Sequence, residues 1–334
     1  MKYMIYTMLY LASASFLLGQ EIWNVKAVLS NGQLIDVKAF DAAGQLYDVK
    51  AFVENNNTQF IDVKAIKNGM KLPIKVMPQE GKVFPVKAID DDGSLLDIKG
   101  FSSIHVKYDI KGVSQSGNIV HIKMLDGTKS QYAVKAISPS GILHDIKGVK
   151  FSEDKTEDVA NGKPFYAHLK ALPQIISNNE SQIWTVKAID PNGKSYPLHA
   201  FAKDGQKFDV KAYAIGGDFH LLDIKAVSGN QLLPVKIMNT EETLFPVKAI
   251  TQSGEILDVK ALDAEGRIID VKGIAKDGNI IHIKAIDSNG RNMGIKAISP
   301  SGNFFDVKGI KTANQKQVNG VTFAAHIKGM PQEK

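Results

Sequence analysis

The segment Gln33–Gly44 reads QLIDVKAFDAAG, and a pattern within it recurs along almost the whole chain. The pattern is x-h-h-Asp-Val-Lys-Ala-h, where h is a large apolar residue, followed by a turn that ends in Gly. The segment that starts at Gln45 repeats it as QLYDVKAF. We number the positions of this repeat from one to eight, so that Asp36 is at position four and Lys38 at position six. A chain of such units is expected to form one strand and one turn per repeat.

The repeats predict an internal duplication. The lysine at position six recurs mostly every twelve residues, but spacings of fourteen and then eleven interrupt the series twice, at lysines 50, 64 and 75 and again at lysines 211, 225 and 236. The two Trp residues, Trp23 and Trp184, are separated by the same 161 residues. We therefore expect two homologous β-repeat domains of about twelve strands each, over residues 20–177 and 178–334.

The residue types in each unit favour strands and tight turns. Val, Ile and Phe are strand formers, and the units show no helical periodicity. Turns such as Pro191-Asn192-Gly193 fit a type I turn with Gly in the left-handed conformation, which is the three-residue hairpin loop. The predicted fold is all-β with mostly antiparallel strands, barrel-like or sandwich-like, and with a β-solenoid or a β-propeller as alternatives.

Alternation along each strand predicts two different faces. Ile35, Val37 and Ala39 share one face, which we expect to form the core because position seven is nearly always Ala or Gly and permits close packing. Asp36 and Lys38 lie on the opposite face. Repetition would make that face a lattice of alternating Lys and Asp, in which each exposed pair contributes well under ~1 kcal/mol.

A three-residue loop also fixes the register of the hairpin. Lys38 is then expected opposite Asp48, and Asp36 opposite Lys50. Identical hairpins on both sides would require Val49 to bond both neighbours with the same backbone groups, which an antiparallel pair does not allow. We therefore expect alternating turn types, bulges in most strands, or a parallel solenoid, and favour antiparallel strands with bulges.

The first residues, MKYMIYTMLYLASASFLLGQ, carry one Lys, then an apolar run, then small residues. This order is typical of a secretory signal peptide, which we place at residues 1–19, with a membrane anchor as the alternative. No later segment has the ~18 apolar residues of a spanning helix. The predicted location is therefore the periplasm, the cell surface or the extracellular space. The chain has no Cys, so an exported form has no disulfides.

The charge balance argues against specific nucleic-acid recognition. The formal net charge is +6, but the excess is almost wholly Lys, and Arg occurs only at positions 267 and 291. Arg is the usual residue for bidentate contacts to bases and phosphates. The predicted export of the protein also argues against specific nucleic-acid recognition.

The candidate catalytic and metal-binding residues are explained by the repeat. Asp at position four lies two residues from a Lys on the same face, which favours an ionised carboxylate rather than a general acid. The His residues at position four are too far apart in sequence for a typical metal site: they are His121, His168, His282 and His326. We expect no catalytic residue, no cofactor and no metal.

Two inserts break the rhythm at matching places in the two copies, over residues 150–163 and 311–319. Loops on a regular scaffold often carry binding. The alternative is a surface excursion that only connects the last strand of each copy.

These observations favour an exported, non-enzymatic β-repeat protein that acts as a scaffold or binding module. The regular spacing resembles that of β-repeat proteins of bacterial cell envelopes, but no motif in the chain transfers a function from them. An alternative is binding of carbohydrate or an acidic polymer through a Lys-rich sheet face, with Lys260, Lys272, Lys284 and Lys296 as candidate residues. A remote alternative is a hydrolase or metal enzyme built from the inserts and the His residues. The partner, the oligomeric state and whether the halves share a core stay open.

Overall fold

The computed structural model describes residues 20–81, 83–128, 130–152, 155–175, 180–240 and 243–332. Within these ranges the chain folds into β-strands and turns, with one short 3-10 helix, η1 (Ile215–Gly217). The predicted all-β fold is therefore confirmed. The predicted signal peptide and the predicted boundary between residues 177 and 178 lie outside the described residues.

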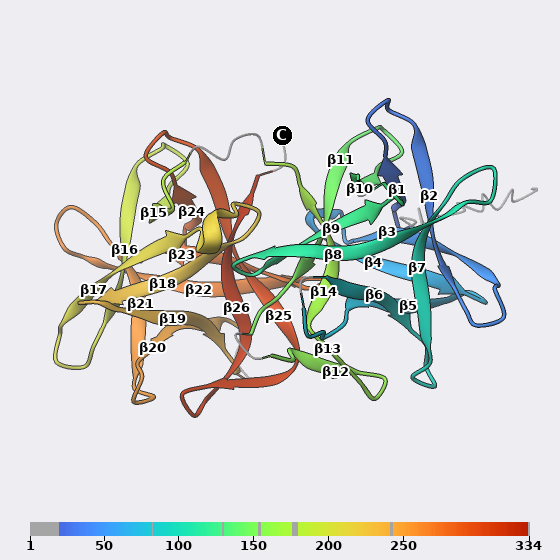
Figure 1. The fold of residues 1–334 in the computed structure, drawn as a ribbon. Helices are drawn as coiled ribbons and strands as arrows, with labels where there is room; N and C mark the ends of the chain where they lie inside the picture. The colour runs from blue at the N-terminus through green and yellow to red at the C-terminus, as the bar shows by residue number, and fades with distance from the viewer. Residues whose placement is uncertain are drawn as a thin grey trace, which may run out of the picture.

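The duplication is confirmed by two separate twelve-stranded sheets, which lie side by side in Figure 1. The sheet of the first half consists of β1 (Ile22–Val28), β2 (Leu34–Phe40), β3 (Leu46–Glu54), β4 (Asn57–Lys67), β5 (Met70–Val76), β6 (Phe84–Ile89), β7 (Leu95–Phe101), β8 (Lys107–Ser116), β9 (Ile119–Leu125), β10 (Gln131–Ile137), β11 (Leu143–Val149) and β14 (Ala167–Pro173). A small separate hairpin, β12 (Asp158–Ala160) and β13 (Lys163–Phe165), occupies the insert.

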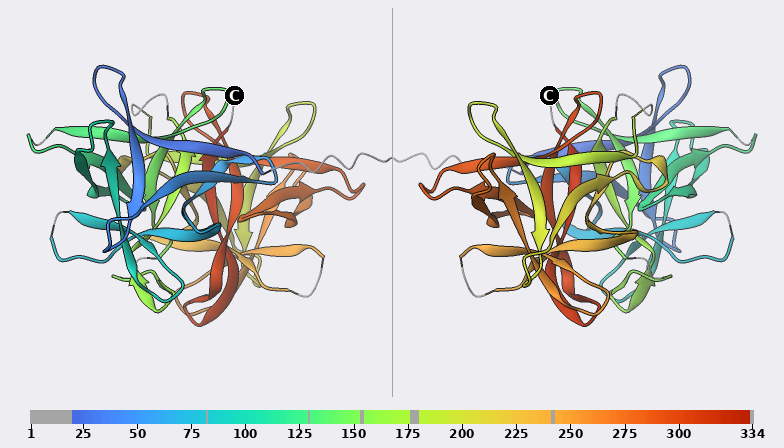
Figure 2. Two further views of the ribbon diagram at one scale, coloured as in Figure 1. Left: turned by 90° about the vertical axis from the view of Figure 1, so that its right-hand side faces the viewer. Right: turned by 90° about the vertical axis from the view of Figure 1, so that its left-hand side faces the viewer.

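The sheet of the second half follows the same order, and its hairpin turns, like those of the first, project outward (Figure 2). It consists of β15 (Ile183–Ile189), β16 (Ser195–Phe201), β17 (Lys207–Tyr213), β18 (Leu222–Ser228), β19 (Gln231–Met238), β20 (Phe245–Ile250), β21 (Ile256–Leu262), β22 (Ile268–Asp277), β23 (Ile280–Ile286), β24 (Asn292–Ile298), β25 (Phe304–Val318) and β26 (Val321–Pro331).

In each half the strands meet in groups of three, in which every strand pairs with the other two. We call such a group a three-strand junction. The junctions of the first half are β1 with β2 and β3, β4 with β5 and β14, β6 with β7 and β8, and β9 with β10 and β11. Those of the second half are β15 with β16 and β17, β18 with β19 and β26, β20 with β21 and β22, and β23 with β24 and β25.

Each strand pairs along its other edge with a strand of a different junction. In the first half these pairings are β1 with β10, β2 with β7, β3 with β4, β5 with β6, β8 with β9 and β11 with β14. Every junction is thereby linked once to each of the other three, which is the connectivity of a tetrahedron. The second half has the equivalent six pairings.

This arrangement corrects the predicted register. Lys38 lies opposite Asp48, as predicted, but the predicted pairing of Asp36 with Lys50 is wrong, because Asp36 lies opposite Lys26. One part of the strand edge pairs with the strand of the preceding repeat, and the other part pairs with the strand of the following repeat. No backbone group therefore has to bond two neighbours. Most pairings need no bulge, although a few shift register, for example between β3 and β4.

The predicted core face and turns are confirmed. Ile35, Val37 and Ala39 are buried, with at most 4% of their surface exposed. A Cβ atom at Gly100, another position seven, would lie 2.5 Å from the Sδ atom of Met124, which explains why this position stays small. Gly193 closes its turn with a φ of +82°, in the left-handed region that favours glycine.

The two halves have separate cores and are joined by a third apolar cluster. Its members form equivalent pairs across a pseudo-two-fold axis, because the residue numbers within a pair differ by 161, or by 158 for the last pair. The pairs are Phe60 and Leu221, Ile119 and Ile280, Val149 and Ile310, and Leu172 and Met330. The chain therefore resembles a two-fold dimer made from one polypeptide. Among the described residues, no helix has the length and apolarity needed to cross a lipid bilayer.

Candidate functional site

Two junctions of each half lie at the interface between the halves, as the members of the third apolar cluster show. A group of buried charges lies between one junction of the first half and the equivalent junction of the second. Junction A is formed by β4, β5 and β14, and junction B by β18, β19 and β26. In junction A the register places Lys170 opposite Asp62 and His168 opposite Lys75. These are the usual repeat positions six and four, so the residues that are half-exposed elsewhere become covered here by the second half.

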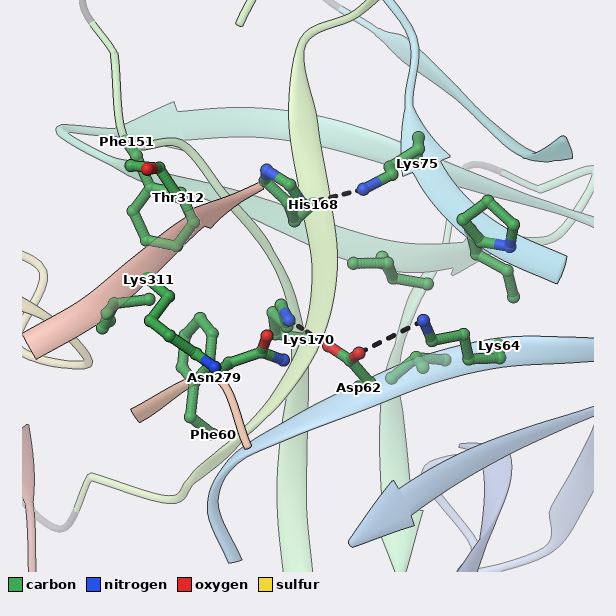
Figure 3. A pocket seen from close by; sticks show the side chains of 15 residues that line it. Phe60, Asp62, Lys64, Lys75, Phe151, His168, Lys170, Asn279, Lys311 and Thr312 are labelled. Atoms are coloured by element: carbon green, nitrogen blue, oxygen red, sulfur yellow. Dashed lines mark hydrogen bonds and ion pairs between the residues drawn. The ribbon is translucent and has the colours of Figure 1, made fainter. Parts of the chain in front are cut away.

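Junction A holds three lysines around one carboxylate (Figure 3). Asp62 bonds the Nζ atom of Lys170 and lies 3.2 Å from the Nζ atom of Lys64. The Nζ atom of Lys75 lies 2.7 Å from Nδ1 of His168. Position four of β5 is Pro73, so two of the three position-four residues of this junction, Pro73 and His168, carry no carboxylate.

Junction B repeats this arrangement. Asp223 bonds the Nζ atom of Lys328 and lies 3.5 Å from that of Lys225. The Nζ atom of Lys236 lies 2.7 Å from Nδ1 of His326. Asp223 and Lys328 are 6% and 4% exposed, so the pair is buried. A buried pair of this kind needs good geometry to offset the cost of removing both charges from water.

The electrostatics follow from burial beside an excess of lysines. Burial alone would raise the pKa of Asp62, but Lys170 and Lys64 outweigh it and hold that pKa well below its usual range. Burial, with Lys170 as the next cause, lowers the pKa of Lys75 to about 7. Burial also lowers the pKa of His168 well below its usual value, again with a contribution from Lys75. The cluster is therefore poor in negative charge.

The two inserts meet at this place. Phe151, from the insert of the first half, lies between the two histidines, with ring centroids 5.4 Å from His168 and 5.6 Å from His326. Glu157 of the same insert places its Oε1 atom 3.2 Å from Nε2 of His168. Lys316, from the insert of the second half, donates a hydrogen bond to the backbone carbonyl oxygen of Glu157 at 2.9 Å. The two inserts therefore contact each other where the two junctions meet.

Glu157 is buried, and burial raises its pKa to about 8. Its second oxygen, Oε2, is buried and has no hydrogen-bond partner in the part of the chain that the structure describes. At neutral pH this side chain is mostly protonated and can donate a hydrogen bond, because a neutral carboxyl keeps one O–H.

Two adjoining cavities of about 330 and 310 Å³ open between the junctions and share Phe151, His168, Lys311 and Thr312. Asn118 of the first half reaches across one of them and donates to Asp223 at 2.7 Å. Among the residues that the structure describes, the lining contains eight lysines and four carboxylates. The lysines are Lys64, Lys75, Lys170, Lys225, Lys236, Lys311, Lys316 and Lys328; the carboxylates are Asp62, Glu157, Asp158 and Asp223.

The surface lysines selected from the sequence lie elsewhere. Lys260 and Lys272 belong to the junction of β20, β21 and β22, and Lys284 and Lys296 to that of β23, β24 and β25. Lys272 and Lys284 lie opposite each other across β22 and β23. Lys260 bonds its hairpin carboxylate, Asp270, and Lys296 does the same with Asp306. The four therefore belong to two junctions that adjoin where Lys272 lies opposite Lys284.

The histidines have separate environments, apart from the pair around Phe151. His121 accepts or donates a hydrogen bond with the hydroxyl of Ser116 at 2.9 Å, and His282 lies 3.6 Å from Asp277. Within the described residues, no group of three or more His, Asp or Glu side chains is arranged to hold a metal ion.

Sequence reasoning missed the central cavity because its lysines look like all the others. The signal was the loss of carboxylates at position four, as at Pro73, Pro234, His168 and His326. That signal identifies a site only when it is known which three repeats meet and which junction faces the other half.

Comparison with known proteins agrees with the duplication. A model of a family of unknown function (DUF7486) matches residues 20–172 and again residues 180–330. No protein with a curated description and no solved structure matches the chain. Each match covers one of the two twelve-stranded sheets. The chain therefore belongs to the DUF7486 family and carries two copies of its domain in tandem.

Proposed function

We propose that the protein is an exported, non-enzymatic binding module of the cell envelope that holds an anionic ligand between its two halves. The observation that carries the proposal is the excess of lysines over carboxylates among the described residues that line the central cavities, eight against four. With Glu157 mostly protonated at neutral pH, the imbalance is larger still. Cavities of about 300 Å³ are within the range of ligand sites.

The lining supports a ligand with an acidic group on a compact body. Buried ammonium groups repel one another, and the lowered pKa of Lys75 reflects burial and its neighbour Lys170. An anion placed among them would replace the lost hydration and relieve that repulsion. Protonated Glu157 can donate its O–H to the same anion through the unpartnered Oε2. Phosphate, sulfate and carboxylate groups, as on acidic polysaccharides, share this chemistry.

Export is supported by the N-terminal sequence alone, where one Lys is followed by an apolar run and small residues. Mass spectrometry of the protein recovered outside the cytoplasm tests it. A new N-terminus at Gln20, or at Ser15 from the alternative cleavage after Ala14, supports export. An intact Met1 on all of the protein contradicts cleavage by a signal peptidase.

A second candidate is a cationic patch on the outer sheet face. Lys272 and Lys284 lie opposite each other on the neighbouring strands β22 and β23, and their partners on the other strand edge are Pro246 and Gly294 rather than Asp. Long acidic polymers, which are too large for the central cavities, could lie along this face. Binding of this kind should weaken steeply with salt because the charges are partly exposed.

Two matched double variants distinguish the candidates. K75M/K236M removes one lysine from each central junction and keeps the side-chain volume, whereas K272Q/K284Q removes the outer pair. Binding of inorganic sulfate and of sulfated and uronic acid oligosaccharides is measured at about 50 and about 300 mM salt. The proposal predicts that K75M/K236M weakens binding at least tenfold and that K272Q/K284Q leaves it unchanged. The reverse pattern would assign binding to the outer face. Turnover of the ligand that a point mutation abolishes would contradict a non-enzymatic role.

A further inference from the structure

Both arginines of the chain line one cavity in the second half, separate from the central cavities. Arg267 and Arg291 are the only arginines in a chain with 41 basic Lys and Arg residues. The cavity has a volume of about 430 Å³, and Tyr196, Ile269 and Met293 also line it. All other Lys and Arg residues of the chain are lysines. The two arginines at this cavity therefore indicate a role that is specific to it.

Three equivalent turns build this cavity, 190–194, 263–267 and 287–291, which come from three different junctions. Each turn begins with Asp, has Gly with a positive φ at its fourth residue and continues with a basic residue, Lys194, Arg267 or Arg291. The Oδ1 atom of each Asp accepts a hydrogen bond from the backbone N–H of that basic residue, at 2.9, 2.8 and 2.9 Å. The turn geometry therefore places three cations around one space.

The two arginines are held in fixed orientations. The Nε atom of Arg267 donates to Oδ2 of Asp263 at 2.5 Å, and that of Arg291 donates to Oδ2 of Asp287 at 2.7 Å. The Arg side chains are 75% and 69% exposed, although their carboxylate partners are nearly covered. Each guanidinium carries four further N–H donors on its terminal nitrogens, in a rigid plane. One terminal nitrogen of Arg267 also donates to Oε2 of Glu265 at 3.2 Å.

The charge of this cavity differs from that of the central cavities. Asp190, Asp263 and Asp287 balance the three cations, and Glu265 adds a further carboxylate 3.2 Å from a terminal nitrogen of Arg267, so the site has no net attraction for an anion. The third carboxylate, Asp190, accepts a hydrogen bond from the hydroxyl of Tyr196 at 3.2 Å. The lining therefore offers both donors and acceptors, together with the apolar side chains of Ile269 and Met293. A saccharide suits such a wall, because each hydroxyl both donates and accepts and the ring has apolar faces.

The fold does not require these residues. In the first half the positions equivalent to Asp190, Asp263, Arg267 and Arg291 hold Leu29, Ser102, Val106 and Ser130. Both halves form the same sheet with the same pairings. Asp287 has an equivalent in Asp126 of the first half, but both arginines, Asp190 and Asp263 are specific to the second copy.

We propose that the second half binds a neutral saccharide where the turns 190–194, 263–267 and 287–291 meet. The site is independent of the anion site between the halves. Arg267 and Arg291 would donate to ring and exocyclic oxygens, and Asp190 would accept from a hydroxyl.

The test uses the full-length mature protein and three neutral probes, cellohexaose, maltohexaose and chitohexaose, with inorganic phosphate as the anionic probe. Binding is measured by calorimetry at about 50 and about 300 mM salt. R267K/R291K keeps the charges and removes the planar fork of donors. V106A/S130A changes the equivalent positions of the first half and serves as the control.

At least one hexasaccharide should bind with an affinity that salt leaves unchanged. R267K/R291K should weaken that binding about tenfold or more, since hydrogen bonds from a charged donor are lost, and V106A/S130A should leave it unchanged. The proposal is overturned if none of the three saccharides binds, or if saccharide binding survives R267K/R291K. Binding of phosphate alone, in an arginine-dependent and salt-sensitive manner, would also overturn it by showing an anion site.

Discussion

The Nε2 atom of His220, in the second half, lies 3.0 Å from the Oδ2 atom of Asp145, in the first half. The other ring nitrogen of His220 lies 2.8 Å from Asp218, so the ring bridges two carboxylates. At the pseudo-two-fold equivalent place Gln59 donates to Asp306 at 3.1 Å. Two equivalent hydrogen bonds therefore connect the halves. One involves a titratable side chain, His220, and the other involves a neutral amide, Gln59.

The stability of the protein should depend on the protonation of His220. Burial opposes its charge, but the bonds to Asp145 and Asp218 outweigh burial and raise the pKa of His220. Because the pKa is raised, His220 contributes to the free energy of unfolding. The contribution is complete below about pH 6.5, the pKa of an unfolded His, and is lost as the pH rises through the pKa of the folded state. H220Q should cost about 2 kcal/mol at pH 5.5 and less at pH 8.5.

Denaturant unfolding of wild type and H220Q at the two pH values measures this effect. Q59H, which places a histidine at the equivalent position opposite Asp306, is the matched variant and should add a pH dependence of the same sign. Equal losses in H220Q at both pH values would contradict a charged His220 at the interface.

Glu157 should make the folded state less stable as the pH rises. Its pKa is about 8 in the folded protein, because it is buried, and about 4.5 when unfolded. Between these values the unfolded chain has released the proton and the folded chain still holds it, so stability falls with rising pH. E157Q, which is neutral and of similar shape, should be more stable than wild type at pH 8 by roughly 2 kcal/mol. A lower melting temperature of E157Q at pH 8 would show that the carboxylate is ionised and favourably paired.

Binding of an anion should be accompanied by proton uptake. Lys75, with a pKa of about 7, is mostly neutral at pH 8, and a bound anion favours its charged form. Titration calorimetry at pH 8 in two buffers of different ionisation enthalpy should show an uptake approaching one proton. K75M should abolish most of that uptake, whereas K272M, on the outer face, should retain it. Identical heats in the two buffers would contradict the role of Lys75.

The first half alone should form a two-fold dimer. Residues 20–175 have their own core, but separation exposes Phe60, Ile119, Val149 and Leu172, which pack against equivalent residues in the full chain. A second copy of the same half offers a matching surface, because the native interface is itself pseudo-symmetric. Light scattering should therefore give the mass of a dimer, and I119D should give a monomer. A wild-type fragment that is a folded monomer would show that the interface depends on residues found only in the second half.

The repeat unit was a good predictor of local structure and a poor one of long-range pairing. Ile35, Val37 and Ala39 form the core face, and Gly193 has the left-handed turn conformation, because these features depend on alternation and turn chemistry within one repeat. The pairing of Lys38 with Lys99 could not be predicted, since all strands carry nearly the same sequence and no pattern distinguishes one distant partner from another. The expected pairing of Asp36 with Lys50 failed because one strand edge is shared between two neighbouring repeats, which places Asp36 opposite Lys26 of the preceding repeat.

The candidate site was predictable only in outline. The inserts were identified as the specific features, and both of them reach the central cavities through Phe151 and Lys316. Some of the lysines that matter, such as Lys64 in the segment IDVKA, have the same sequence context as Lys260 in LDVKA, which lies outside these cavities. Their difference arises from which junction is covered by the other half, and that is a property of the assembled fold rather than of a single repeat.

The most direct test of the account is a crystal structure of the mature protein soaked in sodium selenate, with anomalous diffraction to locate selenium. The account predicts anomalous peaks in the central cavities, among Lys75, Lys170 and Lys64 or among Lys236, Lys328 and Lys225. Their loss in K75M/K236M crystals would confirm the assignment. Peaks confined to the outer face at Lys272 and Lys284, or no peaks at all, would contradict the central claim that the two halves enclose an anion site.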